Sequence, residues 1–223
     1  MQDPEIINGY DNIYHPAEDT YLIIDYFKKE VSNKHFDGLD LRQIRKILDL
    51  GTGTGIIAIF LQLLTKKYLK FTSKIYASDL LIESIECARK NQEINNIPNE
   101  IELIHSDLFA AFPDSLKHSF DIIIFNPPYL PSSKLVQENE TKKAMDHSWD
   151  GGKKGYEITL RFLDEVTDFL RPHSKNYIYF ISSSSVNLTE LQDLVEQKGF
   201  IIQKLDKTHV FFEDIILYRL SVS

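Results

Sequence analysis

The run Asn126-Pro127-Pro128-Tyr129 places an amide side chain, backbone carbonyls and an aromatic ring directly after the apolar segment 121–125. Proline has no backbone N–H to donate, and it keeps the residue before it out of the helical region. The carbonyls of the run are therefore free to accept hydrogen bonds from a ligand. Together these groups could hold a planar NH2 group by both of its N–H bonds. A plain turn after a strand is the alternative.

A glycine-rich segment upstream forms a second candidate site. Gly51, Gly53 and Gly55 lie between an apolar strand pattern and an apolar helical pattern, and glycine lets a ligand approach the backbone because it has no Cβ. Dinucleotide-binding loops have the spacing G-x-G-x-x-G and bind a pyrophosphate. Here the spacing is G-x-G-x-G, and Asp49 would repel phosphate but suits an amino-acid ammonium group. The segment therefore indicates S-adenosylmethionine, with a ligand-free strand–helix turn as the alternative.

Two further carboxylates close the next two strand patterns of the chain. Residues 74–79 end in Asp79, and residues 101–107 end in Asp107. At these positions Asp79 could accept from the hydroxyls of a ribose, and Asp107 from an adenine amino group. Either residue alone could instead cap a helix. Their places at successive strand ends behind the glycine loop favour a ligand-binding role.

The elements that must position these residues alternate between strand and helix patterns. Helical spacing occurs in residues 19–29, 56–64, 80–95, 156–170 and 188–197. Strand patterns occur in residues 47–50, 74–79, 101–106, 121–125, 176–181, 200–205 and 215–220. Seven strands with helices between them predict an α/β fold with a doubly wound, mostly parallel sheet whose last strand runs antiparallel.

We expect a single domain over residues 1–223, with an N-terminal arm and short helix in 1–43 and the core in 44–223. Asp19 or Thr20 is predicted near the cap of the first helix, and residues 31–41 are predicted to form a loop. Residues 131–152 are long, polar and weakly periodic, and they follow the Asn126 motif directly. We expect them to form a lid, with disorder as the alternative.

Composition excludes several classes of protein. No apolar stretch is long enough for a membrane helix, and no signal-peptide pattern is present. The single cysteine, Cys87, is compatible with a reducing cytoplasm. No spacing of His or Cys predicts a metal site. The net charge of -8 makes unaided binding of nucleic acid unfavourable.

The chain resembles class I S-adenosylmethionine-dependent methyltransferases, and among them the HemK-like glutamine methyltransferases that modify peptide-chain release factors. The matching segments are residues 15–20 (His-Pro-Ala-Glu-Asp-Thr), 49–55, Asp79, Asp107, 126–129 and 149–152 (Trp-Asp-Gly-Gly). The Asn-Pro-Pro-Tyr motif is shared with adenine-N6 methyltransferases, whereas the first and last segments favour the protein-glutamine branch. The resemblance implies that S-adenosylmethionine is bound, and S-adenosylhomocysteine released, by Thr20, Asp49, Gly51, Gly53, Asp79, Asp107 and Asn126.

The implied substrate is the glutamine of a Gly-Gly-Gln loop in a release factor. We expect the Asn126 side-chain oxygen and the Pro127 carbonyl to accept the two amide N–H bonds, with Pro128 and Tyr129 completing the acceptor site. An amide nitrogen is a weak nucleophile, so catalysis must come from orientation and electrostatics. Adenine-N6 methylation of RNA or DNA is the alternative, because that amino group presents the same donors. A catalytically weak binding subunit is a third hypothesis.

The resemblance also implies a partner. Bacterial members carry a helical substrate-binding domain ahead of the core, for which residues 1–43 leave no room. The chain is similar in size to the archaeal and eukaryotic form, which works with a small zinc-binding activator subunit. We expect that subunit to dock at the strand over residues 101–106, at the border of the sheet, where unpaired backbone groups are exposed.

Overall fold

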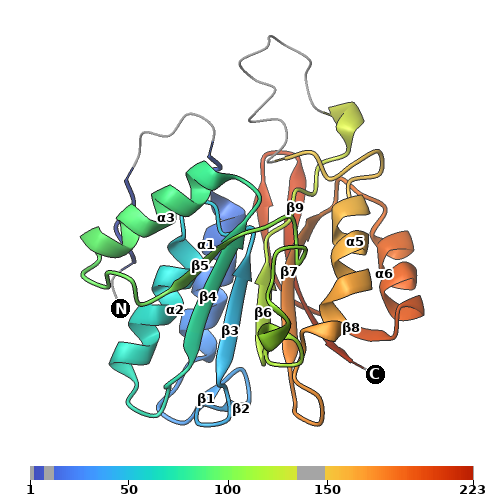
Figure 1. The fold of residues 1–223 in the computed structure, drawn as a ribbon. Helices are drawn as coiled ribbons and strands as arrows, with labels where there is room; N and C mark the ends of the chain where they lie inside the picture. Colours follow the sequence, from blue (N-terminus) through green and yellow to red (C-terminus); the bar gives the residue numbers. More distant parts are fainter. Residues whose placement is uncertain (1–2, 8–12, 135–148, 223) are drawn as a thin grey trace.

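The structure, a computed structural model, describes residues 3–7, 13–134 and 149–222. Its centre is a seven-stranded sheet in the order β5-β4-β3-β6-β7-β9-β8, with helices packed against both faces (Figure 1). The strands are β3 (Lys46–Leu50), β4 (Lys74–Asp79), β5 (Glu102–His105), β6 (Ile122–Phe125), β7 (Tyr177–Ser183), β8 (Phe200–Val210) and β9 (Glu213–Val222). β3 to β7 run parallel, and β9 is antiparallel to both β7 and β8. The predicted sheet with its antiparallel last strand is confirmed.

The helices are α1 (Glu18–Glu30), α2 (Ile56–Lys67), α3 (Ile82–Ile94), α5 (Glu157–Glu165) and α6 (Leu188–Gln197). Successive residues of a strand point to opposite faces, so the central strands feed two cores. On one face, Ile122 and Ile124 of β6 pack in a cluster with residues of α1 and α2. On the other, Ile123 and Phe125 share a cluster with residues of α5 and α6. Apolar residues on both faces of β6 are what a buried parallel strand requires.

Two segments differ from the prediction. Residues 31–41 contain a short hairpin, β1 (His35–Phe36) and β2 (Leu39–Asp40), instead of only a loop. Asp37 and Gly38 form its turn with φ of +45° and +77°, and Asp-Gly is a favoured pair for a turn that needs two positive φ values. The helix predicted over 156–170 ends at Glu165 and continues as the 3-10 turn η3 (Val166–Asp168). Two more 3-10 turns are η1 (Asp114–Leu116) and η2 (Ser132–Lys134).

In the described ranges, none of the helices is long and apolar enough to cross a membrane.

Candidate active site

A cavity of about 320 Å3 opens at the carboxyl ends of the parallel strands. It lies beside the point where the strand order reverses, between β3 and β6, which is where open α/β sheets bind ligands. Nine of the ten predicted site residues line this cavity: Thr20, Gly51, Gly53, Asp79, Asp107, Asn126, Pro127, Pro128 and Tyr129. The fold therefore gathers the strand-end residues as expected. Asp49 is not among the lining residues.

The glycine loop forms one wall of the cavity. Gly53 has a φ of +53°, and its N–H donates to the Asp79 carboxylate at 2.8 Å. Gly55 also has a positive φ, and a Cβ at this position would lie 2.8 Å from the Cβ of Ala88 in α3. Gly51, like Gly53 and Gly55, has a positive φ, so the loop needs glycine at all three positions, and at Gly55 also for the close packing of α2 on α3.

Asp49 lies beneath the loop and supports it. Its carboxylate is 1 % exposed and one of its oxygens accepts from the Thr52 hydroxyl at 2.5 Å and from the Ala58 N–H at 3.2 Å. These bonds fix the turn from β3 into α2. Burial raises the pKa of Asp49 to about 7, against the lowering effect of the two hydrogen bonds.

This burial predicts a pH-dependent effect of the substitution Asp49→Asn. Because the folded protein holds the Asp49 proton more tightly than the unfolded chain, this carboxyl favours folding most below its ordinary pKa of 3.8, and that contribution is lost as the pH rises towards 7. An asparagine oxygen can accept the same two bonds without titrating. We therefore expect the free energy of unfolding of Asp49→Asn, relative to the parent, to rise by about 2 kcal/mol between about pH 5 and about pH 8. Urea unfolding at both pH values measures it; a pH-independent difference would contradict it.

Asp79 faces the cavity with both oxygens already engaged by the backbone. One accepts from the Gly53 N–H, and the other from the Leu81 N–H at 2.9 Å. Burial raises the pKa of Asp79, while these bonds lower it. The carboxylate is therefore held in a fixed orientation between the glycine loop and the start of α3.

Asp107 occupies a more open position on the rim. Its carboxylate is about half exposed and pairs with Arg161 of α5 at 3.0 Å. Such an exposed pair contributes little to stability, but it links the loop after β5 to α5 across the cavity. Arg161 was not among the predicted site residues, although it also lines the cavity.

Asn126 is oriented by a residue from the first helix. Its side-chain N–H donates to the Asp19 carboxylate at 3.0 Å, and its side-chain oxygen is buried with no hydrogen-bond partner among the described residues. A carboxylate only accepts, so the nitrogen of the amide must face Asp19 and the oxygen must face away from it. A buried acceptor without a donor carries a free-energy penalty of about 1–3 kcal/mol. That oxygen is therefore a candidate binding point for an N–H of a ligand.

Asp19 accepts hydrogen bonds from four residues, and its role was not predicted. The carboxylate is 2 % exposed and accepts from the Tyr14 hydroxyl at 2.6 Å, the Thr20 N–H at 2.5 Å, Asn126, and the Tyr129 hydroxyl at 3.2 Å. As predicted, Asp19 and Thr20 lie near the helix cap, which is Ala17 and makes no side-chain bond; the part of Asp19 in the site is additional. The signal was the matched segment 15–20, in which only Thr20 was assigned to the site.

The two tyrosines around Asp19 remain neutral hydroxyl donors. Burial and the neighbouring Asp19 carboxylate raise the pKa of Tyr14 and of Tyr129 well above the usual value. The Tyr14 ring also makes an edge contact with Trp149, with centroids 4.8 Å apart. Tyr14 and Trp149 both line the cavity. Their rings close it on the side of the first helix.

The segment from Trp149 to Gly155 holds the Asn126 loop in place. Leu130 donates to the Trp149 carbonyl, and Gly151 donates back to the Leu130 carbonyl, both at 2.9 Å. A Cβ at Gly151 would lie 2.7 Å from the Pro128 carbonyl oxygen, so only glycine allows this approach. Residues 135–148 of the predicted lid lie outside the described part of the chain.

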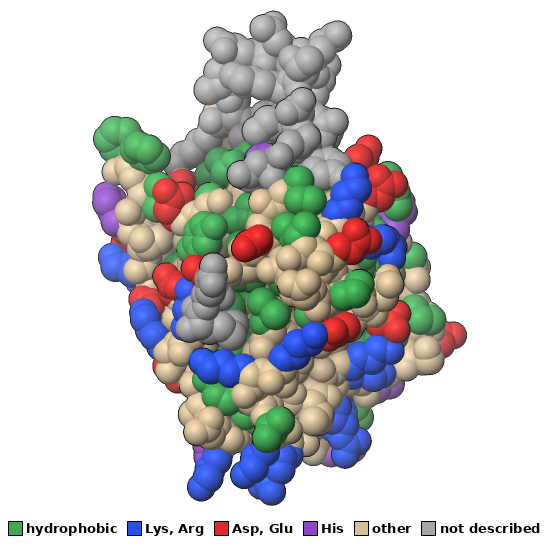
Figure 2. Space-filling view, turned by 90° about the vertical axis from the view of Figure 1, so that its left-hand side faces the viewer, with side chains coloured by type: hydrophobic (Ala, Val, Ile, Leu, Met, Phe, Trp, Pro, Cys, Tyr) green, Lys and Arg blue, Asp and Glu red, His purple; other side chains and the backbone are tan. Residues whose placement is uncertain are grey.

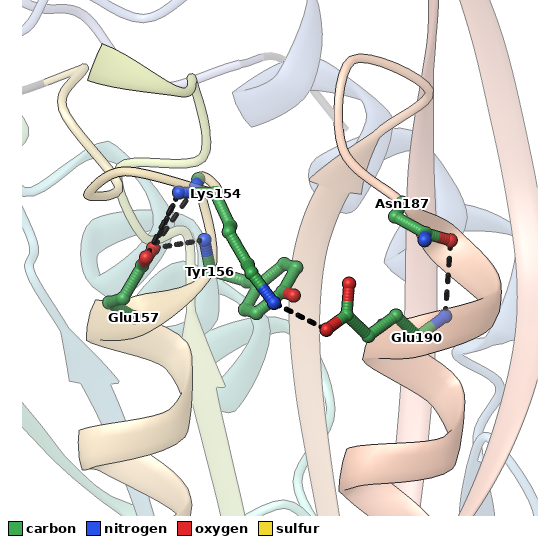
Figure 3. Close-up of polar contacts among 6 residues, drawn as sticks. Lys154, Tyr156, Glu157, Asn187 and Glu190 are labelled. Atoms are coloured by element: carbon green, nitrogen blue, oxygen red, sulfur yellow. Dashed lines mark hydrogen bonds and ion pairs between the residues drawn. The ribbon is translucent and has the colours of Figure 1, made fainter. Parts of the chain in front are cut away.

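Two acidic side chains anchor that segment to α5 and α6, as Figure 3 shows. The Glu157 carboxylate accepts from the backbone N–H groups of Lys154, Gly155 and Tyr156. The Lys154 ammonium pairs with Glu190 of α6 at 2.5 Å, and Glu190 lies in the first turn, capped by Asn187. The Gly-rich segment is thus positioned by two helix N-termini.

No metal centre is formed by the described residues, since they contain no group of three or more His, Cys, Asp or Glu side chains placed to hold an ion. The polar groups of the cavity are hydrogen-bond donors and acceptors that suit an organic ligand.

Comparison with known proteins gives consistent results. Residues 32–175 match the model of the methyltransferase small domain. The "Putative protein N5-glutamine methyltransferase MJ0928" of Methanocaldococcus jannaschii is 30 % identical over 92 % of this chain and 89 % of its own length. The eRF1 methyltransferase catalytic subunit mtq2 of Schizosaccharomyces pombe is 26 % identical over 96 % and 91 %. A solved structure of the E. cuniculi Mtq2-Trm112 complex, responsible for methylation of the eRF1 translation termination factor, has a TM-score of 0.64 and 23 % identity over 95 % and 99 % of the two chains.

Proposed function

The chain belongs to the methyltransferase small domain family, in the group of protein N5-glutamine methyltransferases, and on this premise we propose that it methylates a glutamine side chain of a peptide-chain release factor. The observation that carries the proposal is the buried, unpartnered oxygen of Asn126, held in place by Asp19. It is a buried acceptor that lacks a donor, and no hydrogen bond among the described residues uses the carbonyl of the next residue, Pro127. A carboxamide NH2 supplies two such donors.

We propose S-adenosylmethionine as the methyl donor, with S-adenosylhomocysteine as the product. The cavity of about 320 Å3 is within the size range of small-molecule sites. At its glycine wall there is little space for a side chain, because a Cβ at Gly51 would lie 3.4 Å from the Phe125 ring. Gly51, Gly53 and Thr20 would hold the amino-acid end, Asp79 the ribose and Asp107 the adenine, with Asp49 supporting the loop from below. When bound, the cofactor supplies a methyl group on a positively charged sulfur.

The residues of the acceptor site would act by orientation. The Asn126 oxygen accepts one N–H of the glutamine amide, and the Pro127 carbonyl accepts the other. No hydrogen bond among the described residues uses the Pro127 carbonyl, while the Pro128 carbonyl faces Gly151. With both protons held, the nitrogen faces the methyl group, and the two oxygens stabilise the positive charge that develops on it. Tyr129 walls the acceptor plane, and the product nitrogen then loses a proton to water.

Surface charge favours a protein substrate over nucleic acid. The net charge is -8. Figure 2 shows Lys and Arg side chains mainly in the lower half of the face seen there, whereas Asp and Glu side chains are frequent in its upper half. A duplex requires a continuous positive surface beside the site, and this face does not provide one.

We propose that a small activator subunit binds the outer edge of β5. This strand lies at the border of the sheet and pairs only with β4 among the described strands, so its second edge can add a strand from another chain. The Mtq2-Trm112 complex supports such a partner. Zinc binding by the activator stays a prediction.

A methyl-transfer assay tests both proposals. The chain is mixed with Trm112, radiolabelled S-adenosylmethionine and one of three acceptors: full-length E. cuniculi eRF1, eRF1 whose Gly-Gly-Gln glutamine is replaced by alanine, or an adenine-containing oligonucleotide. We expect label in the first acceptor only. Label in the oligonucleotide alone would overturn the proposed function. We also expect much lower activity when Trm112 is omitted, and full activity without it would contradict the proposed partner.

A further inference from the structure

The most exposed apolar side chains near the site are two consecutive phenylalanines. Phe211 and Phe212 form the turn between β8 and β9, and they are 88 % and 100 % exposed. Scattered exposed apolar residues are common on soluble proteins, but two adjacent aromatic rings that are both this exposed mark a candidate interaction site. Neither ring contributes to a core cluster.

This turn stands at the same end of the sheet as the active site. β9 is antiparallel to β7, and Ile215 pairs with Ser183 at the carboxyl end of β7, so the turn projects beyond that end (Figure 1). Phe125, the residue before Asn126, pairs with Phe180 of the same strand. Counting residues along and across the strands places the turn roughly 20 Å from Asn126.

The turn is held in one orientation by its neighbours. The Glu213 carboxylate accepts from the Ser183 hydroxyl at 2.9 Å and from the Ser185 hydroxyl. The Ser184 N–H donates to the Asp214 carbonyl at 2.8 Å, and the Asp214 N–H donates to the Ser184 hydroxyl at 2.9 Å. Hydrogen bonds therefore fix the hairpin that carries the two rings to the loop after β7. Because the turn is already ordered, less conformational entropy is lost when a partner binds.

A groove runs from the cavity towards the turn. It lies between the start of α1 and β8, and it is lined by residues 16–18, 21, 22, 25, 29 and 206–208. Pro16 lines both this groove and the cavity, and Tyr21 in the groove is 40 % exposed. Thr208, at the far end, is only three residues before Phe211. The groove therefore covers part of the way from the acceptor site to the aromatic turn.

Building on the function proposed above, we propose that Phe211 and Phe212 are the docking point for the folded body of the protein substrate, outside the loop that carries the glutamine. A standard protein interface covers about 800 Å2 on each partner, a patch roughly 30 Å across. One such footprint can include both Asn126 and the turn, whereas a free glutamine or a single nucleotide cannot reach so far. The occupant would be a folded protein with an apolar pocket beside the methylated loop.

The test is a KM measurement with the double variant Phe211→Ser/Phe212→Ser. In the presence of Trm112, we expect its KM for full-length eRF1 to rise about tenfold or more, the effect of losing an aromatic contact at an interface centre. The kcat at saturating eRF1 and the Kd of S-adenosylmethionine are expected to stay unchanged, since neither ring lines the cavity. The pair Phe211→Leu/Phe212→Leu keeps the apolar surface and should recover most of the parent KM.

Leu69→Ser is the matched control. Leu69 is 93 % exposed and follows α2 at the opposite end of the sheet, so its loss should leave KM unchanged. An unchanged KM in the double serine variant would overturn the proposal. So would loss of Trm112 binding, or a change from dimer to monomer on that substitution, because the turn would then serve the activator or a second copy. If the unmodified chain does not methylate eRF1 at all, the proposed function fails instead.

Discussion

Replacing Asn126 with alanine is expected to lower the kcat of methyl transfer to glutamine by about 10²- to 10³-fold, the usual cost of losing one hydrogen-bond acceptor or donor that acts on the developing charge. The side-chain oxygen of Asn126 is a buried acceptor without a partner among the described residues, and alanine offers no acceptor in its place. The dissociation constant of S-adenosylmethionine should change far less. Single-turnover kinetics and cofactor binding by calorimetry separate the two quantities.

Asn176→Ala supplies the control for this prediction. The Asn176 side chain donates to the Arg171 carbonyl at 3.0 Å, just before β7 and away from the cavity. We expect its kcat to match that of the parent. Full-speed transfer by Asn126→Ala would exclude the proposed arrangement of the acceptor site.

Loss of the Asp19 carboxylate is expected to be nearly as damaging, with kcat about 10²-fold lower in Asp19→Ala, because a positioning group acts on the transition state through the residue it orients. Without Asp19, the Asn126 amide can turn its nitrogen into the cavity, and the Tyr14 and Tyr129 hydroxyls lose their acceptor. Each buried donor left unpaired costs about 1–3 kcal/mol of stability, so the urea midpoint should fall as well.

A double-mutant cycle distinguishes positioning from simple destabilisation. If Asp19 acts through Asn126, then adding Asp19→Ala to Asn126→Ala should lower kcat little further, although stability should still fall. Independent, additive losses in kcat would show that Asp19 has another role. The conservative variant Asp19→Glu should recover part of the activity.

The sequence predicted the elements of the fold because each carries its own local pattern. β6 is a run of four buried apolar residues, and the glycine loop joins an apolar strand to an apolar helix. The strand ends therefore identified eight residues that the fold brings to one cavity, and the family resemblance added Thr20. The antiparallel position of β9 also followed from the pairing of two adjacent strand patterns.

What the sequence could not predict depends on how the folded segments place individual side chains. Asp19 lies 107 residues from Asn126, and its own neighbourhood suggested a helix start. Asp49 carries the charge expected of a ligand-binding residue, but its place beneath the loop follows from its bonds to Thr52 and Ala58. The hairpin at Asp37 and Gly38 is different, since that dipeptide is a turn signal visible in the sequence.

The fixed polarity of Asn126 has a consequence for damaged substrate. The amide oxygen and the proline carbonyl both present lone pairs, and the Asp19 carboxylate prevents the amide from reversing. Deamidation turns the glutamine into a glutamate, whose carboxylate has two acceptor oxygens and no N–H. The Asn126 oxygen and the proline carbonyl would repel this carboxylate. In the proposed site, only release factors with an intact glutamine would therefore be methylated. Methylation would then indicate that this glutamine had not been deamidated.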